Sequence, residues 1–281
     1  YTFSGSGELD NGWSVALSIA MANGNAYSNA NITIGLPGLG DVRIDQGTSG
    51  TGIQRMDDMT PNVWEEADGG ITAGINKIMG TSAGGTIEIT PSEIMPAGLT
   101  ARFAFSKDAD SGNVNDKGVG GQTGTLGSGW DLTLEAGADL HGMEGLTIYG
   151  GISEVSQHQN AATISGDKEE DVIGIKYAMG GFTVGYQQTN EDTGVTATDS
   201  YENTSYGITF SVNDDLSVGF NHTESDKAGT ADDAEADSLQ VAYTMGGASI
   251  RLMEQDVKNQ TYGNGDTADF DATIISLGLA F

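Results

Sequence analysis

Five carboxylates lie close together in one polar stretch of the sequence: Asp57, Asp58, Glu65, Glu66 and Asp68. Carboxylates at this density attract cations. Calcium takes about six to eight oxygen ligands, and flexible loops rich in carboxylates can supply them. A second acidic group has the same character and consists of Asp232, Asp233, Glu235 and Asp237. Neither group follows the spacing of an EF-hand. A calcium site on Asp57, Asp58, Glu65 and Glu66 and diffuse screening by counterions are therefore two open alternatives, and no cofactor is required.

One catalytic pattern occurs. Residues 80–84 read G-T-S-A-G and fit the G-x-S-x-G nucleophile elbow. That motif needs a strand before the serine and a helix after it, whereas residues 85–90 predict a strand. No metal-ligand spacing, phosphate loop or dinucleotide fingerprint accompanies it. The sequence therefore predicts a protein that is not an enzyme.

The charge balance excludes one class of partner. The chain has 40 acidic and 11 basic residues, a formal net charge of -29, and no cysteine. Nucleic acid binding needs clustered Lys and Arg that release counterions from phosphates, so nucleic acid is excluded. The lack of cysteine excludes a disulfide framework. The chain contains no run of 18 or more apolar residues, so the sequence predicts no membrane-spanning helix.

Apolar residues recur with a period of two along most of the chain. In residues 13–22 they are Trp13, Val15, Leu17, Ile19 and Met21, and the residues between them are small. The same alternation returns in residues 130–140, 173–179, 182–186 and 206–212. A period of two with one apolar face predicts β-strands and argues against disorder.

The predicted strands number fifteen. Their ranges are 2–9, 13–22, 31–36, 41–47, 85–90, 98–107, 128–140, 146–157, 168–179, 181–191, 200–212, 216–226, 236–246, 247–258 and 269–281. Short turns rich in Gly, Asn and Asp alternate with longer polar loops, of which residues 48–84 form the longest. This order predicts one all-β domain over residues 1–281, a transmembrane antiparallel up-and-down β-barrel. Because such barrels have an even number of strands, we expect sixteen, the first one missing from this sequence.

The chain resembles the general porin family of Gram-negative bacteria, and more closely its acidic alphaproteobacterial members. The final residues 274–281 look like the segment ending in phenylalanine that the barrel-assembly machinery reads, which makes Phe281 the terminal assembly signal. With a first strand restored, residues 48–84 become the third external loop, which in porins folds into the lumen. The order of turns and loops is similar to the family's over the whole chain.

The resemblance implies a pore constriction. The five carboxylates of residues 57–68 would lie on the inward loop and face basic side chains of the barrel wall. Strand parity places four bases on the face opposite the apolar one: Arg43, Arg102, Lys176 and Arg251. A charge facing lipid would cost roughly 2–4 kcal/mol at mid-membrane, so inward placement alone needs no function. The alternative is that the acids are merely solvated and the bases merely balance wall carboxylates.

The function implied is a general diffusion porin of the outer membrane, with a water-filled channel that prefers cations and passes ions and small hydrophilic solutes. A substrate-selective channel and a soluble acidic β-protein or adhesin are the alternatives. The expected partners are two further copies in a homotrimer, together with outer-membrane lipid and lipopolysaccharide. The short strands 31–36 and 41–47 favour a trimer, because protein contacts would cover an apolar band that short strands span poorly.

Overall fold

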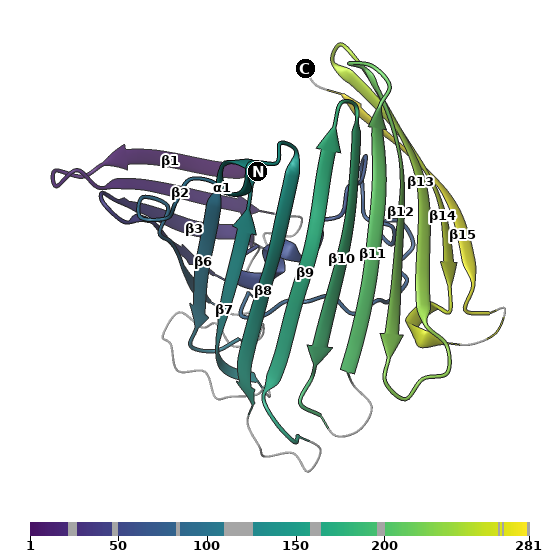
Figure 1. Cartoon of the computed structure of the whole chain (residues 1–281), viewed down its shortest axis with the longest axis horizontal. Helices are drawn as coiled ribbons and strands as arrows, with labels where there is room; N and C mark the ends of the chain where they lie inside the picture. Colours follow the sequence, from purple (N-terminus) through teal and green to yellow (C-terminus); the bar gives the residue numbers. More distant parts are fainter. Residues whose placement is uncertain are drawn as a thin grey trace.

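The computed structural model describes residues 1–21, 27–46, 50–82, 85–109, 126–157, 164–195, 200–263, 265 and 267–279. Fifteen strands form one sheet in chain order, each antiparallel to the next (Figure 1). Their bounds are β1 Thr2–Glu8, β2 Ser14–Met21, β3 Tyr27–Leu36, β4 Gly40–Asp45, β5 Thr86–Thr90, β6 Leu99–Ser106, β7 Leu126–Ala136, β8 Leu146–Gln157, β9 Lys168–Met179, β10 Phe182–Asp192, β11 Ser200–Ser211, β12 Leu216–Lys227, β13 Ala234–Met245, β14 Ala248–Lys258 and β15 Phe270–Leu279. The up-and-down architecture predicted from the sequence is confirmed.

Every predicted strand is present, and two of them have an end that differs from the prediction by more than two residues. β3 begins at Tyr27, although residues 23–30 were predicted to be a loop. The prediction missed this start because residues 27–31 carry no apolar alternation that would indicate a strand. The third predicted strand is therefore ten residues long and not short. β7 ends at Ala136, four residues before the predicted end, because a one-turn helix, α1 (Ala138–His141), follows it.

Within the described residues, β1 and β15 are the two edges of the sheet and are not paired with each other. The sixteenth strand therefore stays a prediction. No helix in the described part of the chain is long and apolar enough to span a membrane.

The two faces of the sheet differ in the opposite sense to those of a soluble protein. Large apolar side chains are exposed on the outer face, for example Ile173 at 61% and Ile275 at 71%. Polar and charged side chains, such as Glu170 and Gln240, are buried on the inner face. An apolar exterior around a polar interior is the arrangement of a transmembrane barrel, whose outer face meets lipid.

The apolar band of the exterior stops before the strand ends that lead to the long loops. Toward the ends of β8 to β14 that lead to the long loops, outward positions carry carboxylates. Glu154 opposite Glu169, and Glu224 opposite Glu235, are cross-strand pairs of this kind. This acidic row marks where the apolar band of the exterior stops.

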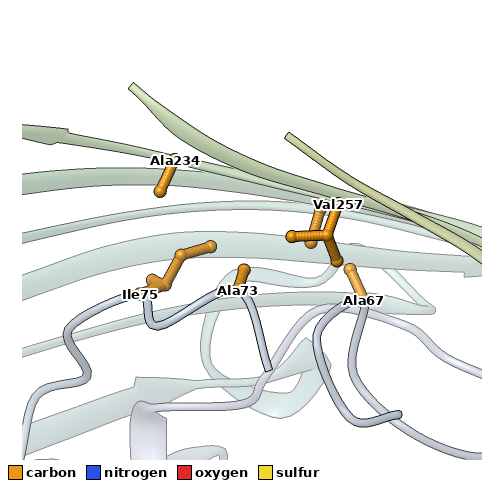
Figure 2. Close-up of a cluster of buried hydrophobic side chains, with 6 residues drawn as sticks. Ala67, Ala73, Ile75, Ala234 and Val257 are labelled. Atoms are coloured by element: carbon orange, nitrogen blue, oxygen red, sulfur yellow. The ribbon is translucent and has the colours of Figure 1, made fainter. Parts of the chain in front are cut away.

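The buried apolar clusters lie inside the curve of the sheet. One contains Ile53, Met56, Ile78, Tyr149 and Val172. The other contains Ala67, Ala73, Ile75, Ala234, Ala236 and Val257, and Figure 2 shows most of these side chains between a loop and the strands above it. In both clusters the first three residues come from the connection between β4 and β5, and the others come from the wall. These clusters therefore fix that connection inside the sheet.

Candidate pore lining and its inward segment

Residues 50–82, which we name the inward segment, pass along the inner face of the sheet between β4 and β5. In Figure 1 they form the blue trace behind the central strands. The segment runs across the inner face of the sheet from β7 to β14 and then returns to β7. β7 and each strand from β9 to β14 contribute one buried polar side chain that forms a hydrogen bond with the backbone of the inward segment. These side chains are Asp131, Glu170, Gln187, Asn203, Asn221, Gln240 and Gln255. The fold-level prediction of an inward-folded long loop is confirmed.

Carboxylates hold the two ends of the inward segment. Glu88 of β5 accepts the Gly52 N–H at 2.7 Å. Asp131 of β7 accepts the Ile53 N–H at 3.2 Å, and from the returning chain it accepts the Thr81 N–H at 3.2 Å and the Thr81 hydroxyl at 2.8 Å. Asp131 is completely buried and therefore ties the entry of the segment to its exit. We call residues 52–55 and 79–82 the root of the segment.

Glycines permit this close approach at the root. Gly52 and Gly80 have φ values of +58° and +52°, the left-handed region that favours glycine. A Cβ atom on Gly52 would lie 1.7 Å from a carboxylate oxygen of Asp131. Turns of this kind direct successive N–H groups to one side and create an anion-binding concavity. The wall carboxylates fill that concavity.

Side-chain amides hold the far end of the segment, residues 61–71. Gln240 of β13 accepts the Trp64 N–H at 2.9 Å and donates to the Glu65 carbonyl at 2.6 Å. Gln255 of β14 accepts the Ile71 N–H at 2.6 Å and donates to the Ala67 carbonyl at 2.8 Å. An amide can donate and accept at the same time, so each glutamine satisfies both kinds of backbone group.

The wall is also shaped to receive the segment. On the inner faces of β10 to β12, a Cβ atom on Gly185 would lie 2.5 Å from Pro61, and one on Gly219 would lie 2.6 Å from Val63. At these positions the glycines make room for the inward segment.

The five predicted constriction acids lie in the middle of the inward segment. Lys77, on the returning chain, forms an ion pair with Glu66 and lies 3.4 Å from Asp68. Burial raises the pKa of the Asp57 carboxyl to about 7, against the opposing charge of Lys77. Burial also raises the pKa of Asp58, although the charges of Lys77 and Lys176 oppose this increase. The structure therefore brings four of the five acids, all except Glu65, together around one ammonium group.

The four predicted wall bases all lie on the inner face of the sheet. Arg43 pairs with Asp45 at 2.7 Å, and Arg102 pairs with Glu135 at 2.5 Å. Lys176 and Arg251 have no ion-pair partner within the described residues. Wall carboxylates therefore neutralise two of the four bases, and the role of all four in a constriction stays a prediction.

Three bases of this site were not identified from the sequence. Arg55 donates from its Nε to Glu88 at 3.1 Å, and Lys168 pairs with Glu170 at 2.8 Å. Lys77 is the third. Arg55 and Lys77 are the two bases of a loop with five acids, and that imbalance was a usable signal for local pairing. The holding glutamines and asparagines carried no signal in one sequence, because their partners are backbone groups.

The remaining sequence predictions have mixed outcomes. Among the described residues, no three His, Asp or Glu side chains lie together in a way that could hold a metal ion, so the calcium site on the loop acids stays a prediction. Phe281 lies outside the described residues. Ser82 of the G-x-S-x-G motif is buried, its hydroxyl donates to Gln54 at 2.5 Å, and strand β5 follows. This arrangement is not a nucleophile elbow.

Comparison with known proteins agrees with this geometry. The family described as Gram-negative porin matches residues 1–250. Among solved structures, a porin is similar with a TM-score of 0.68 and 14% identity, over 100% of this chain and 91% of that chain. OmpF of Salmonella typhi in complex with daunomycin is similar with a TM-score of 0.67 and 12% identity, over 99% and 88%. OmpT of Vibrio cholerae is similar with a TM-score of 0.62 and 11% identity, over 98% and 85%. Comparison with curated protein sequences gave no match. The family match covers most of the chain and confirms the resemblance seen in the sequence, so this chain belongs to the Gram-negative porin family.

Proposed function

We propose that this porin is a general diffusion channel that passes ions and small hydrophilic solutes and prefers cations. As a member of its family, the chain is an integral channel protein of the outer membrane. The observation that carries the proposal is the inward segment, which is bonded along the polar inner face of the sheet from β7 to β14 and would narrow the lumen of a closed barrel. A fixed segment of this kind limits the size of solutes without closing the channel.

The charges of the inward segment support a preference for cations. Residues 50–82 contain five acidic and two basic residues, which gives a net charge of -3. Both bases, Arg55 and Lys77, form ion pairs with carboxylates. An uncompensated negative charge in a narrow lumen concentrates cations, and this effect weakens as salt shortens the Debye length.

Single-channel recording in planar bilayers tests the size limit. Deleting residues 60–75 keeps the root and removes the far end of the segment, so we expect a larger conductance with all strands assembled. Deleting residues 229–232, in the connection between β12 and β13, is the matched control and should leave conductance unchanged. Equal conductance of the first deletion and the intact protein would show that the segment does not limit the pore.

The reversal potential in a low-salt gradient tests selectivity. We expect it to indicate a modest cation preference that declines with increasing salt. An anion-selective reversal potential would contradict the proposed preference.

The proposed working unit is a homotrimer. An apolar groove crosses the outer face of β2 to β5 and is lined by Leu17, Ile32, Ile44 and Ile87. β4 and β5 are six and five residues long, so they span the apolar band poorly and favour a protein neighbour. A mild-detergent sample should contain a heat-sensitive species of three chains. A sample with the mass of one chain before heating would rule the trimer out.

A further inference from the structure

Part of the connection between β14 and β15 contacts the inward segment. We name its residues 259–263 the strap. The Thr261 N–H donates to the Ala73 carbonyl at 2.7 Å, and the side-chain amide of Gln260 donates to the Thr72 carbonyl at 2.6 Å. Thr72 and Ala73 directly follow the far end of the inward segment, where the chain turns back toward the root. The strap therefore bonds to the place where the inward segment turns.

The hydrogen bonds from the wall leave a gap at this turn. Gln255 of β14 bonds to both backbone groups of Ile71. The next wall residue along the segment is Asn203 of β11, whose amide donates to the Asn76 carbonyl at 2.8 Å. Between these two points, within the described residues, the hydrogen bonds from other elements to residues 72–75 come from the strap. The strap therefore completes the attachment that the wall begins.

Tyr262 joins the strap to the returning chain and to the wall at the same time. Its hydroxyl accepts the Asn76 N–H at 3.2 Å and forms a hydrogen bond with the Ser225 hydroxyl of β12 at 2.8 Å. A phenolic hydroxyl can accept and donate together, so it satisfies both partners. The Tyr262 ring packs against the buried cluster that contains Ala73 and Ile75. One side chain of the strap therefore fixes the returning chain directly before Lys77.

The strap holds this position in an unfavourable backbone conformation. Asn259, Thr261 and Tyr262 have φ values of +49°, +57° and +58°, and they are the only non-glycine residues with a positive φ in the described part of the chain. Threonine is β-branched and tyrosine is bulky, so both are disfavoured in this region. Such a conformation persists only where surrounding contacts hold it. Release of the strap from the inward segment would therefore relieve strain.

We propose that the strap is a releasable element that controls the pore. When docked, it holds the turn of the inward segment and keeps the channel at one width. When released, it frees residues 72–76, and the width fluctuates. Because Asn76 directly precedes Lys77, the strap connects a loop at the mouth to the ammonium group among the constriction acids. The effect on current rests on the proposed function, whereas the docking of the strap does not.

A single thiol reports on docking, since the chain contains no cysteine. Ala73→Cys places this thiol where the native side chain is completely buried, and its reaction with a maleimide is followed in mild detergent. Adding Tyr262→Phe removes the hydroxyl that accepts the Asn76 N–H and keeps the ring. We expect the thiol to react roughly tenfold faster, because a buried N–H loses its acceptor.

The matched control is Tyr201→Phe on β11. The Tyr201 ring lies 5.7 Å from the Tyr262 ring, and within the described residues its hydroxyl forms no hydrogen bond with the inward segment. The Tyr201→Phe protein should react at the rate of Ala73→Cys alone. Equal rates for the two phenylalanine variants would overturn the proposal. Trypsin cleavage after Lys77, in the same variants without the added cysteine, is a second measure of docking with the same expected order.

Thr261→Asn tests the strain in the opposite direction. Asparagine adopts the left-handed region more readily than a β-branched residue, and the variant keeps the N–H that donates to Ala73. We expect the Ala73→Cys thiol to react roughly threefold more slowly, since less strain opposes docking. A faster reaction in folded protein, verified by heat-modifiable migration on a gel, would overturn the role of strain.

Single-channel recording tests control of the pore. We expect the open-channel current of Tyr262→Phe to fluctuate more than that of the native protein and of Tyr201→Phe, and the current of Thr261→Asn to fluctuate less. A steady current in Tyr262→Phe, together with a faster thiol reaction, would overturn control of the pore by the strap. Absence of conduction by the native protein would instead contradict the proposed function and leave the thiol result standing.

Discussion

The root and the far end of the inward segment are held by different chemistry. At the root, the carboxylates of Glu88, Asp131 and Glu170 accept backbone N–H groups. At the far end, Gln240 and Gln255 both accept and donate. The difference follows from the backbone. Positive-φ glycines at the root turn successive N–H groups to one side, which suits an anion, whereas the far end presents N–H and C=O groups together and suits an amide.

Removing the central carboxylate of the root is the strongest test of this comparison. Asp131→Ala leaves the N–H groups of Ile53 and Thr81 buried without acceptors. We expect the free energy that holds the root in place to fall by about 3 kcal/mol or more. We expect proteases to cleave within residues 50–82 at concentrations that leave the native protein intact, and we expect conductance to become larger and noisier. Glu135→Ala, on the same strand and face, is the control and should leave the segment protected. Protection of the segment in Asp131→Ala would contradict the role of the root.

The far end should respond less strongly. Gln240→Ala removes three neutral hydrogen bonds to Trp64 and Glu65, each contributing about 1 kcal/mol. We expect limited proteolysis to detect loosening near residues 61–71, with the root still protected. Gln188→Ala, an outward glutamine bonded to Glu202, should have no effect on the segment. Cleavage at the root in Gln240→Ala would mean that the two regions are not independent.

Much of this architecture could be predicted from the sequence, and the limits of the prediction have physical causes. Strands such as β9 and β11 were recognisable because apolar residues alternate along them. The start of β3 was missed, because residues 27–31 do not alternate. The inward path of the long loop was expected from family resemblance, but its attachment was not. Gln240 bonds to backbone groups 175 and 176 positions away, so no local pattern marks it.

Lys77, on the returning chain, lies against the far end and forms ion pairs there with Glu66 and Asp68. Lys77→Gln changes the net charge of residues 50–82 from -3 to -4. We expect the cation preference, measured as a reversal potential at low salt, to increase by roughly twofold, with a small loss of protease protection. Lys107→Gln, outside the segment, is the control. An unchanged reversal potential would place this ammonium group outside the path of the ions.

The smallest expected effect comes from pH. The pKa of Asp57 is raised from 3.8 to about 7 by burial. The folded state therefore binds this proton more tightly than the unfolded chain, and the resulting stabilisation is lost as pH increases from about 4 to about 7. We expect a modest rise in cation preference between pH 6 and pH 8, as Asp57 becomes charged. Asp57→Asn should abolish that rise, and a slope that persists in the variant would assign it to another group.

The position of the holding side chains in the chain has a consequence for the order of assembly. Each strand pairs with its neighbour in sequence, so the sheet can grow hairpin by hairpin from local contacts. The inward segment cannot dock this way, since Ile71 bonds to Gln255, 184 positions later. Strands β13 and β14 must be in place before the far end finds its partners. The newly formed sheet therefore passes through a stage with a wide, unobstructed lumen, and pulse-labelled protein should become protease-resistant within residues 61–71 only after β14 has joined the sheet.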